Sequence, residues 1–203
     1  FLILYLIPFT IGIFSVFSFQ PFNLTFLNFF ILPIFFYLTV FIKKKSKSTY
    51  RKKPYKKNLF IFGTTFGFGF FLGSIHWITN SLSFDENFKF LIPLGFILIP
   101  LFLSLFFSIL TVLVGPFLKL GFNSIILFSA SLALSDYLRA KILTGFPWNL
   151  WSYSFSWVIE YLQILEIVGL FAFNLISITI FMAPSILFLQ IKKINKIFSL
   201  FLI

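Results

Sequence analysis

An acidic and a basic side chain three residues apart give the first indication of chemistry. Asp136 and Arg139 lie near the end of a long apolar run, and this spacing places both on one face of a helix, within pairing distance. Ionisable groups in such a run are costly and are candidates for function. Two interpretations are open: a buried ion pair that fixes packing, or a guanidinium that binds a phosphate or carbonyl group.

A Gly-Phe-Pro-Trp turn follows this pair. Pro147 disfavours helix for the residue before it and Gly145 tolerates unusual dihedral angles, so the chain must leave the helix here. Three of the four Trp residues fall within the ten residues that begin at Trp148, which is denser than an aromatic belt requires. This density favours a surface formed for lipid, with these candidate binding residues: Arg139, Gly145, Phe146, Pro147, Trp148 and Trp151.

His76 and Trp77 are further candidates for substrate binding, near the end of an earlier apolar run. His76 is the single His and the chain has no Cys, so neither a metal site nor a cofactor is expected. For His76, a hydrogen-bonding role and a role as general base are both open. No Ser-His-Asp set, phosphate loop or zinc signature can be assembled, so these residues indicate a binding surface without a catalyst.

The elements that must carry these residues belong to a membrane protein. Of the 203 residues, 60% are hydrophobic and 10% are charged, against about 25% charged in an ordinary soluble domain. Long apolar runs without alternation predict helices and exclude a barrel. The net charge is +11. The basic residues that produce it lie almost entirely in the loops between these runs, so membrane topology explains them better than a nucleic-acid partner does.

A spanning helix needs roughly 20 apolar residues, and the sequence predicts an all-α membrane protein, a polytopic bundle of about seven transmembrane helices. Because the chain begins with Phe and both ends lie in apolar runs, we expect a fragment of a longer protein. Glu166, deep in the sixth segment, should face the bundle or a wet cavity. The predicted segments are 1–18, 24–42, 58–80, 89–114, 121–140, 160–190 and a truncated start at 197–203.

Basic residues in the loops set the expected orientation. They concentrate in residues 43–57, at Lys119 and in residues 192–196, which lie on one side and are therefore assigned to the cytoplasm. The opposite side keeps only Lys89, Arg139 and Lys141, so the Gly-Phe-Pro-Trp turn faces outward. Segment 43–57 could also touch anionic lipid head groups.

Four glycines in the third segment predict close helix packing. Gly63 and Gly67, and likewise Gly69 and Gly73, form small-xxx-small pairs that let a neighbouring backbone approach. No strand precedes them, so they do not indicate a nucleotide site.

Three stretches together resemble one known family. SDYLRAKILTGFPWNLWSYS (135–154) is similar to the E-x-L-R…L-T-G-F-P-W…G-Y-S motif of the apolipoprotein N-acyltransferase family. FSFQPFNL (17–24) and GFGFFLGSIHWI (67–78) resemble its A-F-x-P-[FY] and G-F-x-F-x-x-G-x-x-W-[VI] segments, and 162–175 resembles a later helix. The departures are Asp136 for Glu, Leu132 for Trp and Lys141 for an aromatic residue.

The resemblance implies an eight-helix bundle in the bacterial inner membrane, with a periplasmic nitrilase-like domain between its last two helices. It also implies transfer of an acyl chain from a phospholipid, through a Cys thioester, to the diacylglyceryl-cysteine of an apolipoprotein, with Glu as base and Lys at the oxyanion. All three catalytic residues belong to the domain expected after Ile203. This chain, expected to be monomeric and in contact with membrane lipids, would hold no catalytic residue and would be inactive alone.

Two alternatives to the acyltransferase are open. One is a nitrilase-fused homologue that binds lipid, or assists a glycosyl-carrier enzyme, without transferring acyl groups. The other is a small transporter, which would place charged or Gly/Pro-broken positions in the middle of its segments, whereas the polar groups here cluster at outer ends.

Overall fold

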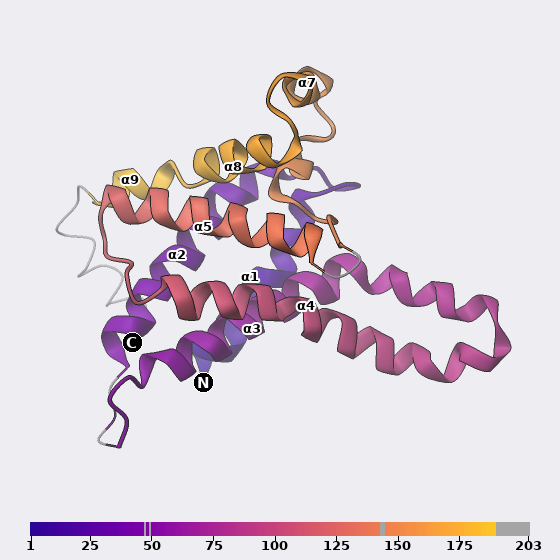
Figure 1. The fold of residues 1–203 in the computed structure, drawn as a ribbon, viewed down its shortest axis with the longest axis horizontal. Coiled ribbons are helices and arrows are strands. Elements are labelled where there is room, and N and C mark those ends of the chain that lie inside the picture. The colour runs from indigo at the N-terminus through magenta and orange to yellow at the C-terminus, as the bar shows by residue number, and fades with distance from the viewer. Residues whose placement is uncertain (47, 49, 143–144, 190–203) are drawn as a thin grey trace.

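A computed structural model describes residues 1–46, 48, 50–142 and 145–189, and all regular structure in this part of the chain is helical. The predicted all-α class is therefore confirmed. Short 3₁₀ segments and turns join the α-helices (Figure 1), which are α1 (Ile7–Ser15), α2 (Asn28–Lys45), α3 (Tyr55–Ile75), α4 (Ile92–Val114), α5 (Phe122–Lys141), α6 (Ile159–Leu162), α7 (Ile164–Val168), α8 (Leu170–Phe181) and α9 (Pro184–Leu189).

Four helical stretches in the described residues are long and apolar enough to cross a membrane. The stretch Leu2–Ser18 is apolar but shorter. α5 forms over the predicted segment, yet it lies outside this group of four because it carries serines and the pair Asp136 and Arg139. The seventh predicted segment, 197–203, lies outside the described residues. The four stretches are Thr25–Lys45, Tyr55–Phe84, Glu86–Val114 and Leu170–Leu187.

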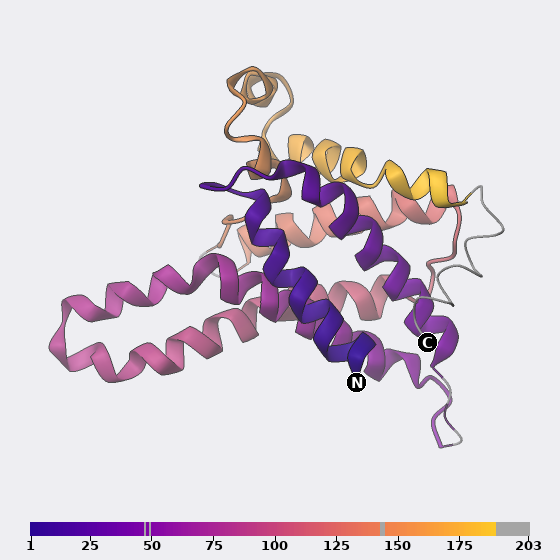
Figure 2. The ribbon, with the colours of Figure 1, turned by 180° about the vertical axis from the view of Figure 1, so that it is seen from behind.

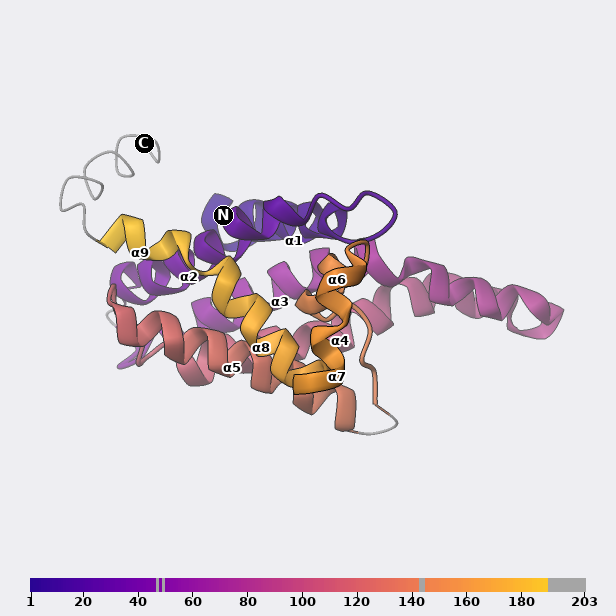
Figure 3. The same cartoon turned by 90° about the horizontal axis from the view of Figure 1, so that it is seen from above.

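A long helical hairpin projects from the bundle. α3 continues without a break into a 3₁₀ segment, His76–Phe84, and a second 3₁₀ segment, Glu86–Leu91, leads into α4. At the turn, the Asp85 carboxylate accepts a hydrogen bond from the Asn87 backbone N–H at 2.9 Å. All three views show this hairpin extending beyond the other helices (Figures 1, 2 and 3). The helices thus continue past the predicted ends of their segments at residues 80 and 89.

Phe35 of α2 lies where four helices meet. Its ring stacks on Phe66 of α3 with centroids 4.2 Å apart. It also meets Phe107 of α4 and Phe128 of α5 edge-on, at 6.0 and 5.6 Å. Phe35 is only 1% exposed, and such offset and edge-on pairs add to the gain from burial. The phenylalanine-rich composition therefore builds an aromatic core between α2, α3, α4 and α5.

The glycines of α3 allow close packing on two sides, as predicted. A Cβ on Gly67 would lie 2.8 Å from the Ser104 Cα of α4, and one on Gly63 would lie 2.8 Å from the Ser108 Cα. On the other side, a Cβ on Gly69 would meet the carbonyl of Phe9 in α1. α1 accordingly lies against α3 (Figure 2). α3 is thus a central helix that touches two neighbours through backbone.

The predicted segment 160–190 is not one helix, which corrects the sequence analysis. α6 and α7 are short and stand at the end of α8 (Figure 3). Gly169 then breaks the helix with φ of 77°, a left-handed value that favours glycine. As a result Glu166 lies in α7 and is exposed, not deep in a spanning helix.

Substitution of Gly67 tests this packing. We expect Gly67→Ala to lower stability by about 1–3 kcal/mol, because the methyl group has no space against the α4 backbone. Gly95→Ala in α4 is the matched control, since its Cβ would meet no atom closer than 3.4 Å. Thermal unfolding in detergent should show a lower midpoint for the first variant only. Equal midpoints would contradict the close approach of α3 and α4.

Candidate functional site

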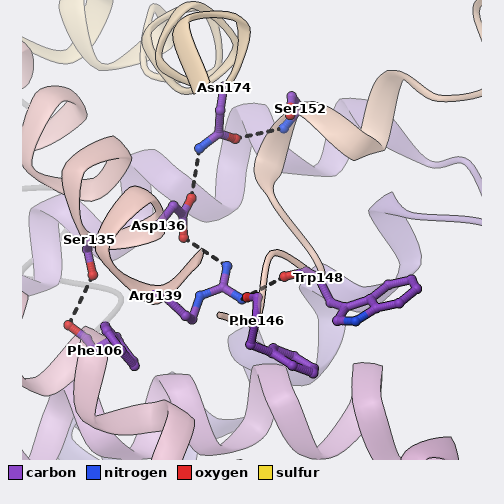
Figure 4. Close-up of polar contacts among 8 residues, drawn as sticks. All are labelled: Phe106, Ser135, Asp136, Arg139, Phe146, Trp148, Ser152 and Asn174. Atoms are coloured by element: carbon purple, nitrogen blue, oxygen red, sulfur yellow. Dashed lines mark hydrogen bonds and ion pairs between the residues drawn. The ribbon is translucent and has the colours of Figure 1, made fainter. Parts of the chain in front are cut away.

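Arg139, near the end of α5, binds the loop that follows it. Its Nη1 donates hydrogen bonds to the carbonyl oxygens of Phe146 at 2.9 Å and Trp148 at 2.6 Å (Figure 4). Its Nη2 donates to Asp136 Oδ1 at 3.1 Å. Arg139 and Asp136 are only 2% and 3% exposed. The predicted pair therefore forms, and it is buried.

The other carboxylate oxygen continues the network into α8. Asp136 Oδ2 accepts a hydrogen bond from Asn174 Nδ2 at 2.9 Å, and Asn174 Oδ1 accepts one from the Ser152 backbone N–H at 3.0 Å (Figure 4). Asn174 is fully buried. We call these six residues the Arg139 network: Asp136, Arg139, Phe146, Trp148, Ser152 and Asn174. It fixes the segment after α5 at three places along its length.

Gly145 makes the turn possible, as the sequence indicated. Its φ is 77°, and a Cβ at this position would lie 2.5 Å from the Ala140 carbonyl oxygen. The next residue, Phe146, donates its backbone N–H to the Arg139 carbonyl at 3.0 Å. The turn therefore folds back onto α5 and brings two carbonyl groups to the guanidinium.

The end of α3 supplies the remaining wall around the guanidinium. Arg139 Cζ lies 5.2 Å from the ring centroid of Phe71, a distance suited to a cation–π contact.

Burial raises the pKa of the Tyr153 phenol above its usual value, and the positive charge of Arg139 partly offsets this. Tyr153 therefore stays neutral at physiological pH and adds no negative charge beside Arg139.

The geometry favours the ion-pair interpretation of Arg139. At least three of its N–H donors are directed at protein oxygens, and a guanidinium has five in total. The network thus uses the residue to hold the loop in place. Its predicted contact with a substrate phosphate or carbonyl stays a prediction.

The candidate tryptophans separate into exposed and buried residues. Trp148 is 51% exposed and Trp77 is 46% exposed, and their rings meet edge-on with centroids 5.6 Å apart. His76 beside them is exposed, and its Nδ1 lies 3.0 Å from the carbonyl oxygen of Gly73 in the preceding helical turn. The structure therefore brings Trp77 and Trp148 together as one aromatic rim, with Pro147 exposed next to it.

Trp151 is a core residue, which corrects its expected place on the lipid-facing surface. It is 0% exposed and stacks on Phe70 of α3 with centroids 5.4 Å apart. Its indole N–H has no hydrogen-bond partner among the described residues. Trp157 is 52% exposed, and its Nε1 donates to Thr25 Oγ1 at 2.8 Å. Trp151 thus anchors the loop to the bundle core.

Sequence reasoning missed Asn174, Ser152 and Thr25. Asn174 had one available signal, because an amide inside the apolar run LFAFNL needs a polar partner. Ser152 takes part through its backbone N–H, which no side-chain pattern can predict. Thr25 donates to the Ser154 carbonyl at 2.5 Å, a contact between segments far apart in sequence.

An apolar groove lies beside the network, between α4 and the loop. Its volume is about 400 Å³. A hydrogen bond of 3.3 Å from Ser135 Oγ to the Phe106 carbonyl joins α5 to α4 next to it (Figure 4). The groove is nearly all apolar apart from Arg139, and its lining includes Leu98, Phe102 and Phe106 of α4 with Ile142, Gly145 and Phe146. Its lining is therefore compatible with apolar groups.

The described residues contain no group of side chains that could hold a metal ion. Among residues 1–46, 48, 50–142 and 145–189, no three His, Cys, Asp or Glu side chains come together. The polar groups of the Arg139 network are hydrogen-bonded to one another and hold the loop after α5 in place. The described residues thus place a buried polar network beside an apolar groove.

The sequence of this chain matches that of a known protein family. The family model of the apolipoprotein N-acyltransferase N-terminal domain matches residues 11–183, which is most of the chain. The chain belongs to this family. The matched region contains the groove, the aromatic rim and the whole Arg139 network. The family and the apolar helices together make this a membrane protein of an acyltransferase family.

Several curated relatives carry the name apolipoprotein N-acyltransferase. Those of Brucella melitensis biotype 1, Rhizobium etli and Rhodopseudomonas palustris are 33%, 31% and 30% identical over 126, 128 and 126 residues. The matches cover 62%, 63% and 62% of this chain. They cover 24% of each relative, so the chain aligns with about a quarter of the length of these proteins.

Removal of the Arg139 charge tests the network. We expect Arg139→Gln to destabilise the protein by about 3–5 kcal/mol, because it leaves the buried Asp136 carboxylate unpaired. The double variant Arg139→Met/Asp136→Leu should recover much of this loss, since both charges are then gone. Thermal unfolding in detergent measures both effects.

Lys141→Gln is the control for this prediction, because it removes an exposed positive charge two residues away. It should leave the unfolding midpoint nearly unchanged. A midpoint for Arg139→Gln equal to that of Lys141→Gln would show that the pair does not stabilise the loop.

Proposed function

We propose that this chain is the membrane part of an apolipoprotein N-acyltransferase. The whole enzyme would transfer an acyl chain from a phospholipid to the N-terminal diacylglyceryl-cysteine of apolipoproteins. The observation that supports this most strongly is the family match over residues 11–183, which includes a loop held by Arg139 beside an apolar groove. The identity with relatives of that name points the same way.

In this proposal the groove receives one acyl chain of a lipid substrate. Its apolar lining from α4 would bury the chain, and burial contributes about 0.8 kcal/mol for each CH₂ group. The rim of Trp77 and Trp148 lies at the same end of the bundle and would hold the glycerol and head-group region, the depth that Trp prefers in membranes. Arg139 acts as a positioning residue, because its donors hold the loop carbonyls.

The reaction itself is assigned to residues beyond this chain. A Cys thiolate of a nitrilase-like domain would attack the phospholipid ester, forming a thioester and releasing the lysophospholipid. The α-amine of the acceptor would then attack the thioester, so that an amide forms and the thiolate returns. The bundle's part is to hold both lipids under that nucleophile, which lowers the entropic cost of bringing them together.

The proposed orientation places the Arg139 network toward the periplasm, in the bacterial inner membrane. Basic residues concentrate at the other end of α5, in segment 43–57 and at Lys119, and such residues favour the cytoplasmic side. A catalytic domain on the periplasmic side would then cover the rim and the groove.

The coding DNA provides the first test. We expect the reading frame to continue past Ile203 into a nitrilase-like domain with Glu, Lys and Cys in that order, followed by a last apolar segment. Sequencing of the native gene measures this directly. A following domain without the Cys would favour the lipid-binding homologue that transfers no acyl group.

Filling the groove tests its role in the full-length enzyme. We expect Leu98→Trp to raise the KM for the phospholipid donor about tenfold, equal to about 1.4 kcal/mol of lost binding, with a smaller change in kcat. Trp148→Ala should also raise the KM for the donor, because it removes one of the two rings of the aromatic rim. Acyl transfer from a fluorescent phospholipid to a diacylglyceryl peptide measures both constants.

Leu94→Trp is the matched control, one helical turn earlier on α4. Leu94 is 54% exposed and Leu98 is 48% exposed, but only Leu98 lines the groove. The same KM for both variants would show that the groove does not hold the donor.

A further inference from the structure

The loops at the end of α5 farthest from the Arg139 network gather positive charge. Nine of the 15 residues from 43 to 57 are Lys or Arg, and none is acidic. A single cation in the α4–α5 loop, Lys119, joins them. We call the described members of this set the basic surface: Lys43, Lys44, Lys45, Arg51, Lys52, Lys53, Lys56, Lys57 and Lys119.

The structure brings the end of α2 next to the α4–α5 loop. Lys43 Nζ donates a hydrogen bond to the Leu118 carbonyl at 3.0 Å, which links the end of α2 to the α4–α5 loop. Lys44 and Lys119 both lie near enough to act electrostatically on the Lys43 ammonium. Cations from the end of α2 and from the α4–α5 loop therefore share one location in spite of their mutual repulsion.

The base of the longer loop is also held in place. Asn58 Nδ2 donates to Ser46 Oγ at 2.9 Å, and this bond joins the start of α3 to the end of α2. Ser46 Oγ in turn donates to the Ile42 carbonyl at 2.6 Å. The lysines at the end of α2 and the start of α3 therefore flank a loop whose two ends are joined by a hydrogen bond.

Among the described residues, no acidic side chain forms a salt bridge with these cations. The five acidic residues of the chain all lie at position 85 or later. The salt bridges found in the described residues are Lys89–Glu86 and Arg139–Asp136, and neither belongs to the basic surface. The surface can therefore pair with anions from outside the protein.

We propose that the basic surface binds the phosphate head groups of anionic phospholipids in the leaflet at this end of the bundle. Lys43, Lys44 and Lys45 form the last turn of α2, directly after its apolar run. Two more, Lys56 and Lys57, lie in the first turn of α3. The cations thus lie where the apolar part of the helices stops, which is the depth of lipid phosphates.

Exposed aromatic rings lie in the same two regions as the cations, and the position of the cations at the ends of apolar helices favours lipid over nucleic acid. Tyr50 is 98% exposed and Phe117 is 71% exposed, and they lie in the two loops that carry the charge. Rings and cations side by side fit the boundary between head groups and acyl chains. The tendency of cytoplasmic loops to be basic explains positive charge here, but it does not require the cations at the end of α2 to meet the cation of the α4–α5 loop.

Lipid titration of the full-length protein tests this inference independently of acyl transfer. Phosphatidylglycerol is added to the protein in phosphatidylcholine-containing micelles, and native mass spectrometry counts the bound lipids. We expect Lys44→Gln/Lys119→Gln to weaken phosphatidylglycerol binding by about fivefold for each lysine, since a basic residue near an anionic surface contributes about 1 kcal/mol. Phosphatidylcholine binding should not change.

Two control variants separate charge at this surface from charge in general. Lys44→Arg/Lys119→Arg keeps both charges and should bind phosphatidylglycerol like the unchanged protein. Lys89→Gln removes a cation from the hairpin tip, where Lys89 pairs with Glu86, and should also have no effect. Loss of binding in Lys89→Gln equal to that in the double variant would overturn the proposal. Tighter binding of a single-stranded oligonucleotide than of phosphatidylglycerol would also overturn it.

Discussion

The buried guanidinium of Arg139 is the interaction on which the rest of the candidate site depends. It holds the loop after α5 by two carbonyl groups, and through Asp136 and Asn174 it connects that loop to α8. A buried charge is very costly unless its partners are all in place. The loop conformation is therefore determined by three separate parts of the chain, and the positions of the groove and the aromatic rim follow from it.

Features set by local chemistry could be predicted from the sequence, and features set by distant partners could not. Hydropathy gave the helical class, and the chemistry of glycine and proline gave the turn at Gly145 and Pro147. Trp148 and Trp151 look alike in sequence, yet one is exposed and the other buried, because Phe70 of α3 lies under only one of them. The break at Gly169 was missed because an apolar run with a single glycine is also compatible with helix.

The positive charges at the two ends of the bundle have different surroundings. At one end the cation of Arg139 is enclosed and paired, so it shapes the protein. At the other end the described cations are exposed except for the half-buried Lys43, and they lack acidic neighbours in the sequence. In the proposed function, one end would keep the substrate site in a fixed shape, and the other would bind lipid phosphates and so fix the depth of the molecule in the bilayer.

The length of the projecting hairpin has a consequence for the membrane itself. Its two arms run over Tyr55–Phe84 and Glu86–Val114, 30 and 29 residues, and at about 1.5 Å per residue each is at least about 43 Å long, against about 30 Å of hydrocarbon. Phe84 and Phe90 near the tip are 92% and 75% exposed. Such exposed apolar side chains disfavour a hairpin tip that extends into water. With its head-group regions a bilayer is about 40–45 Å thick, so each arm can reach from one head-group region to the other, and a lean of the hairpin would bring the rings at its tip to the level of the acyl chains.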